Sequence, residues 1–364
     1  MNNFRKNESK ARDPMKSRNV YPLIRRLLFA SAITLPLSLH ASPPPPTTVS
    51  PAAFAKMSVM QAAQTAKPDF KLPKLDDFAG WKAEQVKFAA MTDVYDKALL
   101  KRFPVEVRER LIAGVPVVEV LPPQVLRDGR KLVYAHGGAY TFGSVRSTLG
   151  SAAMVAHATG MPVISIDYTL APQAKWKVAT AQVISVLRGL QQAGTPLGSI
   201  GVFGDSAGGG LVAGAVLRMR DEGSGMPGAL VLWSPWSDIT ESGDSYVTLK
   251  DTDFLSYAGF LDVCAAAYAS PADQKNPYVS PVYGDYRKGY PPTLIQGGTR
   301  EIFLSNFVRH YQAIVQGGQR AELDLYEGMP HVHQVMMAGT PESDAALARM
   351  TRFIKDTLKP ARPL

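Results

Sequence analysis

Short apolar runs recur from about residue 105 to the C-terminus and alternate with longer stretches whose apolar positions repeat at helical spacing. Near-continuous apolar runs predict strands buried on both faces, which occur in parallel sheets covered by helices. Six such strands are predicted at 131–135, 163–167, 200–203, 229–233, 293–296 and 321–326. Helices are predicted between or after them at 176–192, 206–220, 301–316 and 342–358. A hairpin formed by 105–112 and 115–121 precedes them, so we expect an α/β fold with a mostly parallel, eight-stranded sheet and helices on both faces.

Two segments do not follow this alternation. Residues 51–104 are rich in Ala, Lys, Gln and Leu at helical spacing, which predicts N-terminal helices lying over the core. The gap between residues 234 and 292 is too long for one crossover and contains a helical pattern at 254–269. We therefore expect a helical cap from 51–104 and from about 240–275, on a catalytic domain that spans 105–364.

The first fifty residues have the composition of a targeting segment. Arg25 and Arg26 precede an apolar run at 27–39 that is short for a membrane span and contains Pro36. Residues 1–41 are therefore predicted to be a signal peptide, and 42–50 a proline-rich linker. Export to the periplasm or the medium is expected, with an uncleaved N-terminal membrane anchor as the alternative.

Charge and cysteine content exclude several classes of protein. The net charge is +9, but residues 1–41 hold eight Lys or Arg against two acids, so the remaining chain is only slightly basic. No dense basic stripe favours nucleic-acid binding. The single cysteine, Cys264, allows no intrachain disulfide, and no group of residues has metal-ligand spacing.

Two glycine-rich loops carry candidate chemistry. The motif Gly204-Asp-Ser-Ala-Gly208 lies between a predicted strand and a helix, which is the context of a nucleophile elbow with Ser206 as nucleophile. The segment 136–140 follows the strand 131–135. Enzymes with a nucleophile elbow have the loop that binds the oxyanion at this place. His136 lies on that loop and is therefore rejected as the catalytic base.

The acid and the base should follow in chain order. Glu301 comes just after the strand 293–296, whereas Asp238, after the strand 229–233, is the rival acid. The loop after the final strand offers two candidate bases, His331 and His333. The order serine, acid, histidine is the one that this fold requires.

From about residue 105 onward, the chain resembles the hormone-sensitive-lipase family of bacterial esterases, the alpha/beta hydrolase fold-3 group. The resemblance rests on motifs in the same order along the chain, namely 136–144, 167–172, 204–209, Ser234-Pro-Trp236, Ser280-Pro281, Pro291-Pro292 and Gly328-Met-Pro-His331. The phrase Gly297-Gly-Thr-Arg-Glu-Ile-Phe-Leu304 resembles the ε-lactone hydrolase branch of that family.

The resemblance implies roles for individual residues. It selects His331 over His333 as the base and leaves His333, with Tyr140, for the substrate pocket. The implied oxyanion donors are the amides of Gly137, Gly138 and Ala207. Three positions depart from the family pattern: Ala139 stands where a third glycine is usual, Glu301 replaces the commoner aspartate, and Thr169 stands where arginine is usual. We have no account of Thr169.

The expected activity is hydrolysis of short to medium acyl esters through an acyl-enzyme, with no metal or cofactor. A lactone hydrolase with the same triad is the alternative within enzymes, since lactone and ester cleavage differ only in whether the alcohol stays attached. A non-catalytic small-molecule receptor is the alternative of another class. The expected partner is a small apolar ester or lactone, with no nucleic acid and, after leader cleavage, no stable membrane partner. Whether the protein forms a homodimer stays open.

Overall fold

A computed structural model of the protein describes residues 43–64 and 72–361. The predicted signal peptide, residues 1–41, lies outside the described residues. Within the described ranges, no helix has the length and apolar character needed to span a membrane.

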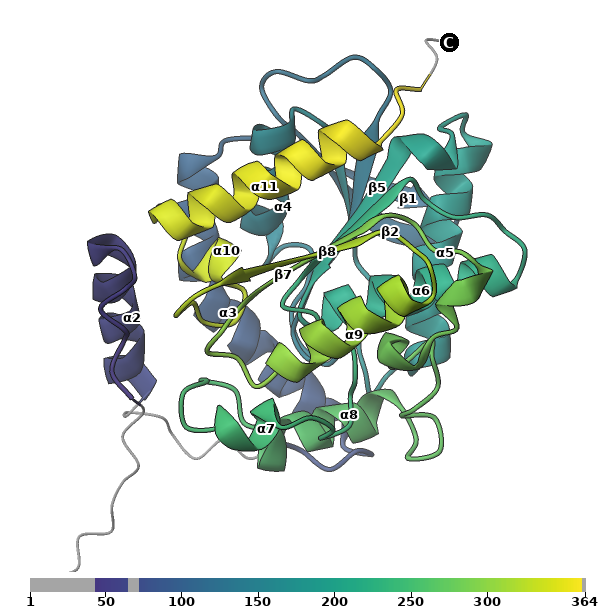
Figure 1. Ribbon diagram of the computed structural model, residues 1–364. Helices are drawn as coiled ribbons and strands as arrows, with labels where there is room; N and C mark the ends of the chain where they lie inside the picture. Colours follow the sequence, from purple (N-terminus) through teal and green to yellow (C-terminus); the bar gives the residue numbers. More distant parts are fainter. Residues whose placement is uncertain (1–42, 65–71, 362–364) are drawn as a thin grey trace, which may run out of the picture. The chain divides into compact units, whose positions relative to one another are not determined.

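The predicted eight-stranded sheet is confirmed, in the order β1-β2-β4-β3-β5-β6-β7-β8 (Figure 1). Strand β2 pairs antiparallel with β1 and β4, and all other neighbours are parallel. The strands are β1 Glu106–Ile112, β2 Val115–Leu121, β3 Lys131–Ala135, β4 Val163–Ile166, β5 Ile200–Asp205, β6 Ala229–Trp233, β7 Thr293–Gly298 and β8 Ala321–Tyr326. Strands β3 to β7 are almost entirely buried, as their unbroken apolar runs predict.

Helices cover both faces of this sheet (Figure 1). Successive strand side chains point to opposite faces, so Leu132 and Tyr134 join one core while Val133 and Ala135 join the other. Helices α4 and α11 pack on the first face, and α5, α6 and α9 pack on the second. The helices of these two layers are α4 Leu149–Thr159, α5 Trp176–Gln192, α6 Ala207–Asp221, α9 Leu304–Gln316 and α11 Pro341–Thr357.

The remaining helices lie before the sheet or in its loops. They are α2 Pro51–Gln64, α3 Phe78–Arg102, α7 Ser245–Thr248, α8 Asp262–Tyr268, α10 His333–Met336 and the short turns η1 Leu197–Ser199, η2 Tyr257–Leu261, η3 Pro281–Tyr283 and η4 Tyr286–Lys288. The predicted helix at 254–269 is therefore wrong in its first half. Gly259 adopts a φ of 80°, which breaks the helix, and regular α-helix begins only at Asp262.

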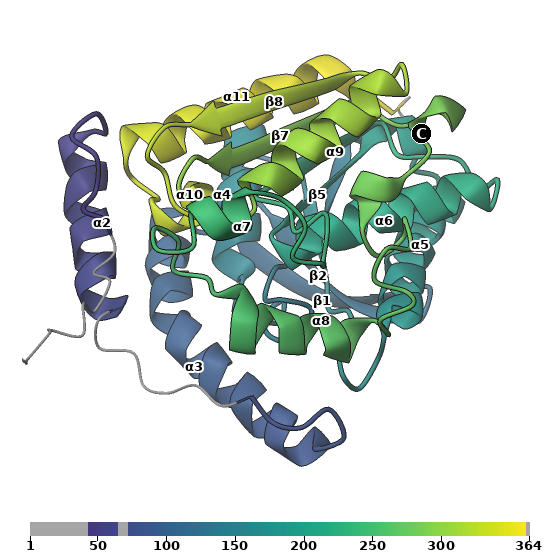
Figure 2. The ribbon, with the colours of Figure 1, turned by 60° about the horizontal axis from the view of Figure 1, so that its bottom comes forward.

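Helix α3 and the segment of η2 and α8 form a helical cover on one side of the molecule (Figure 2). Aromatic rings join the two parts. The ring of Phe142 lies 5.1 Å from that of Phe88 on α3 and 6.0 Å from that of Phe260 on η2. Trp81 of α3 is fully buried and also contacts Phe142. These contacts between apolar rings anchor the cover to the loop that follows β3.

The described part of the predicted proline-rich linker, from residue 43 to the start of α2, packs on the catalytic domain. Arg300 donates hydrogen bonds to the carbonyls of Pro43 and Pro44, and the hydroxyl of Thr48 donates to Glu327. Ser50 bonds through its amide and its hydroxyl to Glu342 at the start of α11. Because Arg300 precedes Glu301 and Glu327 precedes the His331 loop, this segment braces two loops that carry predicted site residues.

Candidate functional site

Ser206 stands at a sharp turn between β5 and the first residue of α6. Its φ of 53° and ψ of −122° are strained for a side chain with a Cβ. Its amide donates to the carbonyl of Trp233, which holds the turn against β6. A Cβ at Gly204 or Gly208 would collide with backbone atoms of neighbouring segments, so both positions require glycine. The local sequence therefore produces the elbow, and the serine lies at a helix N-terminus, where developing negative charge is favoured.

Glu301 and His331 form a buried pair. The Nδ1 of His331 lies 2.7 Å from Oε2 of Glu301, and both side chains are almost completely shielded from solvent. The Oε1 of Glu301 accepts hydrogen bonds from the Gly298 amide and the Ser234 hydroxyl. A carboxylate held in this way fixes the orientation of the imidazole and stabilises its protonated form.

Ser234 is a residue whose role sequence reasoning missed. Its hydroxyl donates to Glu301 and accepts, at 2.9 Å, from the amide of Val332, the residue after His331. One side chain thus ties the acid to the loop of the base. The motif Ser234-Pro-Trp236 was visible in the sequence. The hydrogen bonds of Ser234 with Glu301, 67 positions away, and with Val332, 98 positions away, were not.

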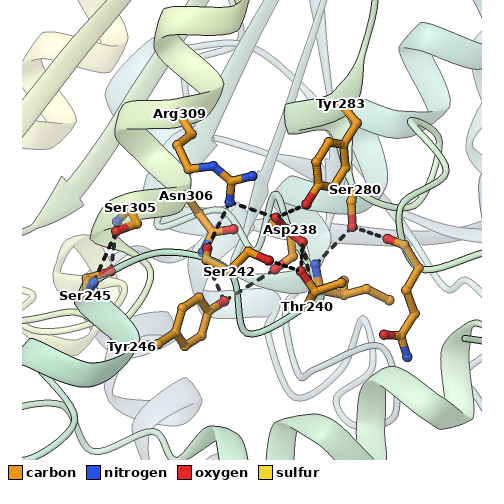
Figure 3. A network of polar contacts seen from close by, with 12 residues as sticks. Asp238, Thr240, Ser242, Ser245, Tyr246, Ser280, Tyr283, Ser305, Asn306 and Arg309 are labelled. Carbon is orange, nitrogen blue, oxygen red and sulfur yellow. Dashed lines mark hydrogen bonds and ion pairs between the residues drawn. The ribbon is translucent and has the colours of Figure 1, made fainter.

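The rival acid Asp238 belongs to a separate network (Figure 3). Its Oδ2 accepts from Arg309 at 2.7 Å and from the hydroxyl of Tyr283 at 2.8 Å. Its Oδ1 accepts from the amide and the hydroxyl of Thr240. Asp238 is fully buried and does not line the pocket that holds Ser206 and His331. Its environment indicates a structural ion pair between the loop after β6 and α9.

The electrostatics of His331 suit a proton acceptor. Burial alone would lower the pKa of its imidazole, but the hydrogen bond and charge of Glu301, aided by the charges of Asp253 and Asp205, raise the pKa above its ordinary value. The pKa of His333, the other histidine of this loop, shifts in the opposite direction, because burial lowers it to about 3.

Asp253 is a second residue that the sequence did not single out. Its carboxylate is buried beside the Glu301–His331 pair and accepts hydrogen bonds from the amides of Ile302 at 2.7 Å and Leu255 at 3.0 Å. Burial raises the pKa of Asp253 to about 6, with a further rise from the charge of Glu301, although the charge of His331 opposes it. Asp253 thereby joins the cap segment to the residue after Glu301.

The loop after β3 contains backbone amides that could bind an oxyanion. One of the amides that we expected to do so is already hydrogen-bonded. The amide of Gly137 donates to Oδ1 of Asp205 at 3.0 Å, so the assignment of Gly137 as a donor does not fit this structure. The amides of Gly138 and Ala139 make no hydrogen bond within the described part of the chain. Ala207 is the first residue of α6, and an amide at that position has no partner inside the helix.

Ala139, which stands where a glycine was expected, adopts a φ of 52°. This left-handed conformation costs a residue with a Cβ roughly 1–2 kcal/mol. The loop is held from behind by His136, which is fully buried, stacks on Tyr168 and has its Nδ1 2.7 Å from the carbonyl of Gly137. The position of His136 agrees with its rejection as the base.

A pocket of about 420 Å³ opens above Ser206 and His331. It is bounded by the loop after β3, the elbow, the His331 loop and both parts of the cover. Its apolar lining consists of Phe88, Met91, Leu99, Ala139, Phe142, Phe254, Leu255, Phe260, Leu261, Val332, Val335 and Met336. The Nε2 of His331 makes no hydrogen bond with Ser206 in this structure; such bonds are often long without substrate and tighten when it binds.

Two predicted substrate-binding residues lie away from this pocket. Tyr140 is buried, and its ring stacks on Tyr268 and Trp236. His333 is fully buried, and its ring lies 4.7 Å from that of Tyr326. Val332 adopts a φ of 50°, so the chain turns between the two histidines and only His331 lines the pocket. Neither Tyr140 nor His333 contacts the space in which a substrate would sit.

Across the described residues, no group of three or more His, Cys, Asp or Glu side chains has an arrangement that could hold a metal ion. Cys264 is buried, and burial raises the pKa of its thiol to about 12. Its sulfur accepts a hydrogen bond from Thr141, which fits a packing role.

Comparisons with known proteins agree with this architecture. A family model described as alpha/beta hydrolase fold matches residues 132–335. An esterase of Acinetobacter venetianus is 31% identical over 270 residues, which cover 72% of this chain and 88% of that protein. A crystallised esterase superposes with a TM-score of 0.77 at 29% identity, covering 87% of this chain and 97% of its own.

A second solved structure, an esterase from the bacterial hormone-sensitive lipase family, superposes with a TM-score of 0.74 at 27% identity and covers 85% of this chain and 99% of its own. The family model covers more than half of the chain, and the motifs that carry Ser206, Glu301 and His331 lie within it. This chain is therefore a member of the alpha/beta hydrolase fold family and, within it, of the bacterial hormone-sensitive lipase esterases.

Proposed function

We propose that the protein is a serine carboxylic ester hydrolase that acts on short to medium acyl esters through an acyl-enzyme. The observation that carries this proposal is the buried Glu301–His331 pair, 2.7 Å apart, in which His331 lines the same pocket as a serine at a strained helix N-terminus. This constellation serves acyl transfer on several unrelated folds. All three residues are present in the chain, which favours an enzyme over a non-catalytic receptor.

The proposed reaction follows from the positions of these groups. The Nε2 of His331 accepts the proton of Ser206 as Oγ attacks the ester carbonyl carbon. The resulting oxyanion accepts hydrogen bonds from the amides of Gly138 and Ala207, with Ala139 in the place first assigned to Gly137. Collapse of this intermediate breaks the bond to the alcohol oxygen, which takes the proton from His331. Water then repeats the sequence on the acyl-enzyme and releases the acid.

Acyl-chain preference tests the proposed substrate class. A pocket of about 420 Å³ with a largely apolar lining accommodates a limited chain. Each methylene buried adds roughly 0.8 kcal/mol of binding, until the pocket ends and overpacking reverses the trend. With p-nitrophenyl esters we expect kcat/KM to peak within acyl chains of about two to eight carbons. A steady rise as far as palmitate would contradict this proposal, and lactones in the same panel test the lactonase alternative.

Exchange of the two candidate acids separates their roles. Glu301→Gln should lower kcat by about a thousandfold to ten-thousandfold, because the neutral amide no longer stabilises the imidazolium or selects its tautomer. Asp238→Asn should leave kcat within about tenfold and lower the melting temperature, since it disturbs the ion pair with Arg309. Circular dichroism confirms folding of both. A larger loss of kcat in Asp238→Asn than in Glu301→Gln would make the acid assignment wrong.

The pH dependence follows from the direction of the His331 pKa. Only the neutral imidazole accepts a proton, so kcat/KM falls as pH drops through the raised pKa, and the acid limb should lie above the ordinary histidine value. In Glu301→Gln the main cause of the rise is gone, and the limb should move to lower pH. Asp253→Asn should move it in the same direction by less. If the acid limb of kcat/KM lay at the same pH in the wild type, Glu301→Gln and Asp253→Asn, it would not reflect the ionisation of His331.

A further inference from the structure

The pocket above Ser206 has a polar side that ester hydrolysis does not use. Most of its lining is apolar, but five polar residues come from α3 and from the start of α4. They are Thr92, Asp96, Ser147, Thr148 and Ser151. The hydroxyls of Thr92 and Thr148 donate to carbonyls of the chain, and that of Ser147 bonds with Ser144. Asp96 is therefore the residue that points to a ligand, because a buried polar group without a hydrogen-bond partner is costly.

Asp96 is the charged member of this group. Only 6% of the residue is exposed, and burial raises the pKa of its carboxyl. Its Oδ1 accepts a hydrogen bond from the amide of Gly150 at 2.6 Å. Its Oδ2 has no partner among the described residues and is not one of their enclosed polar atoms, so it is reachable from the pocket. Half of a buried carboxylate is therefore left without a donor.

The polar side runs from the nucleophile to Asp96. The hydroxyl of Tyr134 donates to Asp205, the residue before Ser206, at 2.6 Å. Ser151 and Thr148 lie close to the same phenol group. Ser151 follows Gly150, whose amide binds Asp96. A substrate whose ester carbonyl lies at Ser206 can thus extend one of its halves along this side.

The sign of the charge on this wall is uniform. The carboxyl groups among the described lining residues are those of Asp96 and Asp205, and that lining holds no Lys or Arg. Asp205 uses its Oδ1 for Tyr134 and Gly137, whereas Asp96 keeps Oδ2 for a ligand. Such a wall attracts hydrogen-bond donors and cations, and it disfavours a substrate that carries a free carboxylate in addition to its ester group.

We propose that Asp96 is a specificity-determining residue that binds a hydroxyl or ammonium group at the far end of one half of the ester. The preferred substrates are then esters that carry a terminal hydrogen-bond donor, and plain alkyl esters of the same length are poorer. This inference rests on the proposed function, because it assigns the substrate of the same site. The competing explanation is that Asp96 only caps the N-terminus of α4.

The substitution Asp96→Asn separates these two roles. Its Oδ1 still accepts from Gly150, so the cap is retained, while its NH₂ replaces the oxygen that faces the pocket. A matched control is Asp93→Asn, which removes a carboxylate one turn earlier on α3 that is half exposed and pairs with Lys97. Thermal unfolding of both variants reports any loss of stability.

The experiment compares matched esters. On the alcohol side these are hexyl acetate, the monoacetate of hexanediol and the acetate of aminohexanol; on the acyl side they are methyl hexanoate and the methyl esters of its terminal hydroxy and amino derivatives. In the wild type, kcat/KM for the hydroxy and amino esters should exceed kcat/KM for the plain ester in either the alcohol-side or the acyl-side series. The measured quantity is the ratio of these two values. In Asp96→Asn this ratio should fall about tenfold to a hundredfold, as expected for a hydrogen bond to a charged group, while in Asp93→Asn it should be unchanged.

A binding measurement keeps this test independent of turnover. In the Ser206→Ala protein, aminohexanol should bind more tightly than hexanol in an NMR titration, and the added substitution Asp96→Asn should remove the difference. Hydrolysis without any preference for donor-bearing esters, or a ratio that Asp96→Asn leaves unchanged, overturns the inference alone. Preferential binding of aminohexanol without hydrolysis of any ester overturns the proposed function and supports the inference.

Discussion

Ser206→Ala should remove nearly all ester hydrolysis, with kcat falling by about a millionfold, while the fold persists. The hydroxyl is the proposed nucleophile, and no other serine, threonine or cysteine of the described pocket lining stands at a strained turn that opens a helix. Alanine keeps the Cβ and the same backbone demands at a φ of 53°, so we expect little change in stability. Steady-state kinetics with a short p-nitrophenyl ester measure the loss.

A serine outside the pocket serves as the control for this substitution. Ser242 exchanges a hydrogen bond with Thr240 in the Asp238 network, and Ser242→Ala should leave kcat within about twofold. An organophosphate should form a covalent adduct with the wild type and with Ser242→Ala, but not with Ser206→Ala. Activity of Ser206→Ala within tenfold of the wild type would contradict a nucleophilic role.

His331→Ala should reduce kcat by a comparable factor, because the nucleophile loses the imidazole proposed to accept its proton. Removal of both members of a catalytic pair costs little more than removal of one, so the double variant with Ser206→Ala should resemble either single variant. The base loop is held through the Val332 amide and Ser234, and not through the imidazole alone, so the fold should remain intact. The measurement is kcat for the single and double variants at a pH above the acid limb.

The matched comparison is His333→Phe, two residues further on. His333 lies outside the pocket and packs on Tyr326, so the substitution should leave kcat within a few fold and should not change the acyl preference. This expectation replaces the role in the acyl pocket that the sequence favoured for His333. If both variants lost activity equally while remaining folded, the base would be unassigned.

Some features of the site follow from short stretches of sequence. The glycines at 204 and 208 permit the turn that exposes Ser206, because any Cβ there would collide with backbone. The buried strands β3 to β7 were readable as apolar runs, and the order of their loops placed Glu301 before His331. Such features depend on backbone preferences and on residues close together in the chain.

Other features depend on side chains that meet only after folding. Gly137 looked like an oxyanion donor until the structure placed its amide on Asp205, 68 residues away. Ser234 and Asp253 position the triad through contacts with residues about 50 to 100 positions away, which no local pattern records. The proline-rich segment has the composition of a linker, yet its carbonyls bind Arg300.

The sequence by itself determined the fold class, the elbow and the order of the proposed catalytic residues, because periodicity and glycine placement act over a few neighbouring residues. Tertiary structure alone decided which amides remain free, which of two histidines faces the pocket and that Asp96 of α3 lies in its wall. The physical reason is that hydrogen-bond partners and burial are properties of the packed chain. The carboxyl group of Asp96 has a raised pKa and an unpaired oxygen only in the folded chain, where the packing of α3 removes this group from water.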